Sequence, residues 1–92
     1  MPSYLVETFL ARGDAGALSR RERSARSAAE ELTQGKTRVR FDRSIHVPED
    51  EICFFVFDAP SGREAALAAQ RAGLEPFRVV EAVLSTNEPG FS

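Results

Sequence analysis

An uninterrupted apolar run at residues 52–57, with the sequence ICFFVF, constrains the fold more than any other feature. Strand residues point alternately to the two faces of a sheet, so this run gives a strand that is apolar on both faces. A chain of 92 residues has room for only one modest core. We therefore expect the chain's own helices to cover one face of this strand and a partner molecule to cover the other.

The segments around this strand predict the order β-α-β-β-α-β. Residues 3–10, 37–47, 51–59 and 78–84 read as strands, because they alternate or are rich in β-branched and aromatic residues. A serine-x-x-glutamate pattern starting at Ser19 predicts a helix over residues 20–34, and a second one at Ser61 predicts a shorter helix. Gly35 and Gly73 stand where a left-handed residue would end each helix.

This order is that of the ferredoxin-like α+β fold, in which two helices lie on one face of a four-stranded antiparallel sheet. We expect one such domain over residues 1–85 and a flexible tail over residues 86–92.

The length of the turn between the two central strands decides what each face of the sheet carries. A three-residue turn pairs Val47 with Glu51. The helix-covered face then carries Val39, Phe41, Ile45, Val47, Cys53, Phe55, Phe57 and Ala59. The uncovered face carries Arg40, Asp42, Ser44, His46, Ile52, Phe54, Val56 and Asp58. This second face is half apolar, which favours a homodimer packed sheet to sheet.

A four-residue turn pairs Val47 with Ile52 instead, and it places His46 directly across from Cys53. A nitrogen and a sulfur donor would then share one face, which suits a transition metal. The three-residue turn is the preferred reading, because it gives the cleaner core face, and the four-residue turn is the alternative.

The chain has one histidine and one cysteine, which excludes an intramolecular disulfide and any motif of two histidines or several cysteines within one chain. The candidate metal ligands are His46, Cys53, Glu49 and Glu51. The alternative is structural: the histidine would be a surface residue, the cysteine a small core residue, and the two glutamates a solvated turn.

The net charge of −2 gives no general attraction for nucleic acid or an anionic membrane, and we expect neither as a partner. Four arginines, Arg20, Arg21, Arg23 and Arg26, crowd the expected start of the first helix. They form either a site for an acidic partner or a solvent face with ion pairs. No signal-peptide pattern or long apolar stretch occurs, so we expect a cytoplasmic protein with a reduced Cys53.

Several stretches resemble a family of small actinobacterial ferredoxin-like proteins known as a domain of unknown function. They are residues 1–7, 44–54, 58–60 and 71–74, and the likeness covers residues 2–84. The best-known type of the family is a nickel-binding homodimer, with a histidine-serine-aromatic run and a cysteine nine positions after the serine. Ser44 and Cys53 keep that spacing, whereas Arg43 and Ile45 replace the histidine and the aromatic residue. The resemblance implies a divergent branch with the same fold and a homodimer, and it makes nickel or another divalent transition metal the expected cofactor.

Two classes of function follow. The first is a non-enzymatic homodimer that binds a divalent transition metal or a small ligand. The alternative, which rests on fold analogy, is a dimeric α+β-barrel enzyme of the monooxygenase or cyclase kind that acts on a small apolar substrate. A purely structural interaction module is a third reading.

Overall fold

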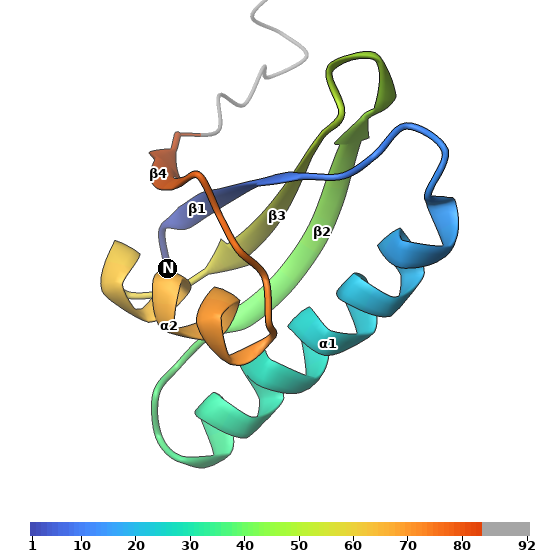
Figure 1. Ribbon diagram of the computed structural model, residues 1–92. Coiled ribbons are helices and arrows are strands. Elements are labelled where there is room, and N and C mark those ends of the chain that lie inside the picture. Colours follow the sequence, from blue (N-terminus) through green and yellow to red (C-terminus); the bar gives the residue numbers. More distant parts are fainter. Residues whose placement is uncertain (84–92) are drawn as a thin grey trace, which may run out of the picture.

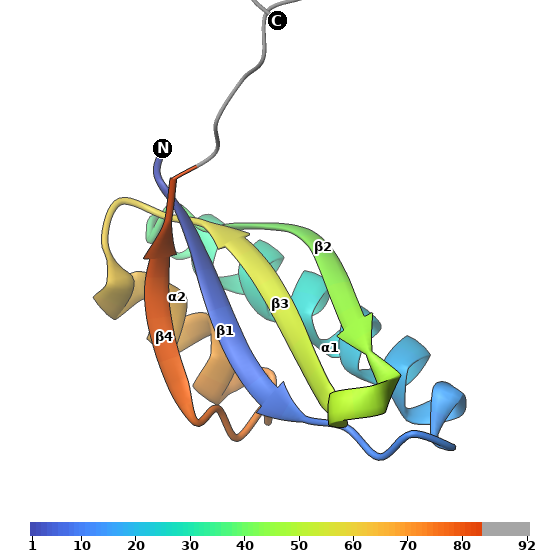
Figure 2. The same cartoon turned by 90° about the horizontal axis from the view of Figure 1, so that it is seen from above.

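An antiparallel sheet with two helices on one of its faces makes up residues 1–83, the part of the chain that the computed structural model describes. The strands are β1 (Ser3–Phe9), β2 (Arg40–Val47), β3 (Ile52–Asp58) and β4 (Arg78–Ala82), and the helices are α1 (Ala15–Gln34) and α2 (Gly62–Arg71). The strand order is β2-β3-β1-β4, with every neighbouring pair antiparallel (Figure 2). The ferredoxin-like α+β fold expected from the sequence is confirmed. Leu84 and the tail expected over residues 86–92 lie outside the described residues.

Helix α1 begins five residues before the start predicted at residue 20. Its N-cap is Asp14, whose side-chain oxygen accepts a hydrogen bond from the backbone N–H of Ala17 at 3.2 Å. Aspartate and serine are both good N-caps, so the sequence offered two starts for one helix. The earlier cap places Ser19 inside the helix and leaves Glu22 available for a contact with the sheet.

The helix ends follow the predicted pattern at one glycine and depart from it at the other. Gly73 has a φ of +77°, the left-handed conformation that was expected after α2. Gly35 has an ordinary φ of −84°, and the next residue, Lys36, takes the left-handed conformation with a φ of 75°. Ser61 caps α2 as predicted, since its hydroxyl accepts from the backbone N–H of Arg63 at 3.3 Å.

The connection between β2 and β3 has four residues, so the three-residue turn that pairs Val47 with Glu51 is wrong. A 3₁₀ turn at Pro48–Asp50 is followed by Glu51 in the left-handed conformation, with a φ of 53°. Val47 therefore pairs with Ile52, and His46 pairs with Cys53.

A β-bulge in β2 also changes the faces of that strand. The pairing with β3 is regular except between Phe41 and Arg43, where Asp42 is the extra residue. Because of this residue, Ser44 and His46 lie on the same face as Phe41, the face that the helices cover. Ile45 and Val47 lie on the opposite face instead of in the core, where the sequence analysis had placed them.

The core lies between the sheet and the helices. Phe41 packs against Phe57 and Phe55, with ring centroids 5.5 and 6.2 Å away. The helices contribute mainly alanines that are almost fully buried: Ala25, Ala28, Ala29, Ala65, Ala68 and Ala69. Small side chains let both helices approach the large phenylalanines of the sheet. The predicted core residues Val39, Phe41, Cys53, Phe55, Phe57 and Ala59 are all buried.

No element of residues 1–83 covers the other side of the sheet, which we call the open face (Figure 2). Its apolar residues are Leu5, Phe9, Ile45, Val47, Ile52, Phe54, Val56 and Val80. The open face is thus more apolar than predicted, because Ile45 and Val47 stand where Ser44 and His46 were expected.

Candidate functional site

A small group of polar side chains lies between α1 and the sheet, and we call it the inner cluster: Glu22, Ser44, His46 and Cys53. Ser44 and His46 are two residues apart on β2, and Cys53 faces His46 from β3. Glu22 reaches the group from α1, where its carboxylate accepts a hydrogen bond from the hydroxyl of Ser44. The four-residue connection places His46 opposite Cys53, and the bulge lets Phe41 share their face, because in a regular strand residues 41 and 44 would point to opposite faces.

The imidazole of His46 is the unusual member of the inner cluster. Its Nε2 atom has essentially no solvent-accessible surface and no hydrogen-bond partner among the described residues. An unsatisfied buried polar atom costs about 1–3 kcal/mol of stability. In the tautomer that carries the proton on Nδ1, this nitrogen has a lone pair that a metal ion can accept.

Cys53 is fully buried beside it. Burial raises the pKa of the Cys53 thiol to about 11; the charge of Arg21 opposes this shift, and that of Glu22 adds to it. Cys53 is therefore a neutral thiol at neutral pH. It would bind a metal as the thiolate, so metal binding would release a proton.

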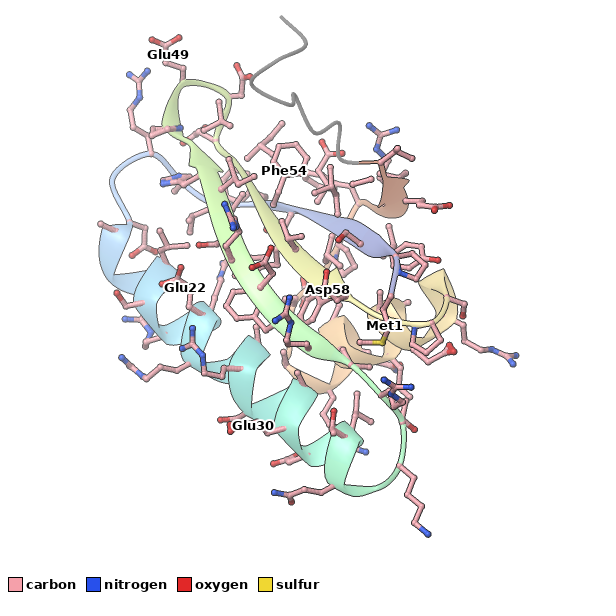
Figure 3. All side chains as sticks on the ribbon, turned by 180° about the vertical axis from the view of Figure 1, so that it is seen from behind. Met1, Glu22, Glu30, Glu49, Phe54 and Asp58 are labelled. Atoms are coloured by element: carbon pink, nitrogen blue, oxygen red, sulfur yellow. The ribbon has the colours of Figure 1, made fainter. Side chains whose placement is uncertain are left out.

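Glu49 and Glu51 do not join His46 and Cys53. Glu49 is exposed at the tip of the β2–β3 connection (Figure 3). The carboxylate of Glu51 accepts a hydrogen bond from the backbone N–H of Arg12 at 3.0 Å. Residues 1–83 contain no group of three or more histidine, cysteine, aspartate or glutamate side chains placed to hold a metal ion. The four candidate ligands thus divide into one nitrogen–sulfur pair and two separate carboxylates.

Sequence reasoning missed Glu22 as a member of the cluster, although a signal was present. Leu18, Ala25 and Ala29 form part of the apolar stripe of α1, and Glu22 falls on the same stripe, four residues after the leucine. A charged residue on a core-facing stripe needs a polar partner inside. Ser44 supplies that partner.

The four arginines of α1 have separate surroundings and do not form one site. Arg21 donates to the backbone carbonyl of Phe9 at 2.7 Å, and Arg26 lies over the ring of Phe41, 5.4 Å from its centroid. Arg20 and Arg23 are exposed. Because α1 begins at residue 15, these arginines follow its first turn rather than crowd it.

A hydrogen-bonded network marks one end of the open face. Asp58 accepts from the hydroxyl of Ser3 at 2.7 Å and from Nε of Arg40 at 3.0 Å. Burial alone would raise the pKa of Asp58, but the hydrogen bonds from Ser3 and Arg40 and the charge of Arg40 outweigh it and hold that pKa below its ordinary value. On the side of β4, Arg78 pairs with Glu7 at 2.8 Å.

A solved structure with the same architecture is SCO4226 from Streptomyces coelicolor A3(2), which superimposes with a TM-score of 0.75 at 14% sequence identity. The match covers 91% of this chain and 99% of that chain. At this identity the likeness shows the fold alone. No protein-family model and no curated protein matches the chain. Within residues 1–83, neither helix is both long and apolar enough to cross a membrane.

Proposed function

We propose that this protein is a homodimer, in which two copies pack through the open faces of their sheets, and that it binds a divalent transition metal without catalysis. The observation that carries the dimer is the apolar character of the open face. Ile45 and Phe9 expose 46% and 53% of their surface, and Phe54 lies among the other apolar side chains (Figure 3).

The size of the open face supports an interface. Four strands give a width of about 19 Å, and seven-residue strands give a length of about 23 Å, so the flat area is about 400 Å². The largest apolar patch on a typical monomer covers about 300–600 Å² and is often a functional surface. A second copy of the chain offers a complementary patch of the same kind, and twofold homodimers are the commonest oligomers.

Light scattering coupled to gel filtration tests the dimer. The wild type is expected to elute with the mass of two chains at micromolar concentration, and the variants Phe54→Asp and Ile45→Asp are expected to be monomers. Phe54→Asp could fail to fold. Ile45 is already partly exposed, so Ile45→Asp is expected to fold even in that case and to report on the dimer. The control is Leu67→Asp on α2, where a similarly exposed apolar residue lies away from the sheet and the dimer should persist. A wild type with the mass of one chain overturns the dimer.

The pair of His46 and Cys53 supports metal binding. An imidazole nitrogen and a thiolate suit nickel, zinc or another borderline to soft divalent ion. The buried Nε2 without a hydrogen-bond partner is the observation that favours this role. The pair lies on the helix-covered face, so packing through the open faces brings no donor from a second copy. Water or a further ligand would complete the coordination.

Calorimetric titration of the purified protein with nickel tests this part. Binding is expected to release heat that depends on the buffer's ionisation enthalpy, since the thiol of Cys53 gives up its proton. A thiolate-to-nickel absorption band should appear in the wild type and disappear in Cys53→Ser. His46→Ala should also abolish binding, whereas Arg23→Gln, at an exposed position on α1, should leave it unchanged. The absence of any saturable heat and of the absorption band in the wild type contradicts the metal proposal.

A further inference from the structure

A groove of about 580 Å³ lies between the C-terminal half of α1 and the start of β2. It is separate from the inner cluster, since its lining residues include none of that cluster's members. Volumes of this size are typical of sites for small organic molecules.

The floor of the groove is apolar. It is formed by Ala29 of α1, by Phe41 at the start of β2, and by Val39, which precedes that strand. Each of these three is at most 9% exposed, so the floor is the outer boundary of the core. The apolar part of a ligand that packs on this floor would exclude water from its own surface and from the floor.

Three arginines line the groove, and their partners decide its charge: Arg26, Arg38 and Arg40. Arg40 is neutralised by Asp58. Neither Arg26 nor Arg38 takes part in an ion pair within residues 1–83. The guanidinium of Arg26 lies over the ring of Phe41 rather than pairing with Glu30, four residues further along the helix.

Glu30 also lines the groove, so its carboxylate offsets one of the two arginines without ion pairs. Positive charge is therefore in excess beside an apolar floor. This combination matches a ligand with a negatively charged head group and an apolar body.

We propose that this groove binds a small amphipathic carboxylate, with its head group held by Arg26 and Arg38 and its aliphatic or aromatic body on the floor. The planar guanidinium group matches the geometry of a carboxylate and can donate two parallel hydrogen bonds to it. The stacking of Arg26 on Phe41 holds one of the two arginines in place before the ligand arrives. The site requires neither the metal nor the dimer proposed above.

Titration of the isotope-labelled full chain with octanoate, followed by amide chemical shifts, tests the proposal. Octanoate is expected to saturate at millimolar concentration or below and to shift the amides of residues 38–41 and of the C-terminal half of α1. Octanol, which has no charge, and acetate, which has almost no apolar body, are expected to bind at least tenfold more weakly. Equal binding of octanoate and octanol overturns the role of the arginines.

Variants locate the site and test how each charged side chain of the groove contributes to binding. Arg26→Gln and Arg38→Gln should each weaken octanoate binding about tenfold, because each removes a charged hydrogen-bond donor. Glu30→Gln should strengthen it several-fold, because it removes the negative charge. Arg23→Gln, on the same helix outside the groove, is the matched control and should change nothing. No saturable binding of octanoate to the wild type, or equal losses in the Arg23 and Arg38 variants, overturns the proposal.

Discussion

Replacement of His46 by leucine is expected to stabilise the protein in the absence of metal. Nε2 of His46 is buried and has no hydrogen-bond partner among the described residues, which costs about 1–3 kcal/mol. Leucine has a similar volume and brings no polar atom into the site. Some packing contacts of the imidazole are lost, so we expect a net gain of about 1 kcal/mol, part of the full cost. For a domain of this size, such a gain raises the melting temperature by about 4–8 °C.

Urea unfolding followed by circular dichroism, in buffer with a chelator, measures this change. The unfolding midpoint should rise while the slope of free energy against urea stays the same, since the exposed area on unfolding barely changes. The matched control is Ser44→Ala, two residues away on the same face of β2. The hydroxyl of Ser44 donates to Glu22, so its removal leaves a carboxylate without that partner and should destabilise the protein by about 1 kcal/mol or more.

The two variants should therefore change stability in opposite directions. If His46→Leu destabilises the protein as much as Ser44→Ala does, the imidazole makes a structural contact that its buried nitrogen does not reveal, and the reasoning is refuted. If the gain appears and nickel binding is lost with it, the histidine lowers the stability of the metal-free protein and is needed for the bound ion.

Three further predictions concern stability and reactivity. The pKa of Asp58 lies below its ordinary value in the folded protein, so its contribution is present above the ordinary pKa and is lost as the pH falls through the folded one. Asp58→Asn should thus cost about 1 kcal/mol in urea unfolding at pH 7 and progressively less as the pH falls below the ordinary pKa of an aspartate; a loss that stays the same as the pH falls contradicts this. Cys53, buried and with a pKa of about 11, should react with iodoacetamide at pH 8 only through unfolding, so urea should speed its labelling, and fast labelling of the native protein would refute the burial argument. Lys36→Gly should stabilise the chain by about 0.5–1 kcal/mol and Gly73→Ala should destabilise it by a similar amount in thermal unfolding, since both positions have positive φ; no change in either would contradict the backbone argument.

The order of strands and helices could be predicted because each element carries its own periodicity. The register of β2 against β3 could not, because it depends on two backbone conformations that the apolar pattern does not encode. Val39, Phe41, Ile45 and Val47 fall on alternate positions, broken only at Arg43, and this pattern favours a regular strand with all four residues in the core. Two backbone features give a different pairing. The left-handed Glu51 belongs to a four-residue connection that pairs Val47 with Ile52, and the extra residue at Asp42 puts Ile45 and Phe41 on opposite faces.

The candidate site was accessible to sequence reasoning only in part. The placement of His46 across from Cys53 was one of two alternatives, and the turn length that separates them is a property of the folded backbone. Glu22 was given a capping role that a second good cap, Asp14, fulfils in the structure. Two competing caps on one helix are hard to rank locally, because the winner depends on which helical face then meets the sheet.

The bulge at Asp42 accommodates one extra residue of this edge strand, so both faces of the strand would survive the loss of that residue. Without Asp42, residues 40, 41 and 43–47 would alternate regularly, with Ser44 and His46 still facing the helices and Ile45 and Val47 still on the open face. Related chains that lack this residue would therefore keep the chemistry of both faces, although the spacing between Phe41 and Ser44 would be one residue shorter. A comparison of such chains should place a gap at Asp42 before it compares their side chains.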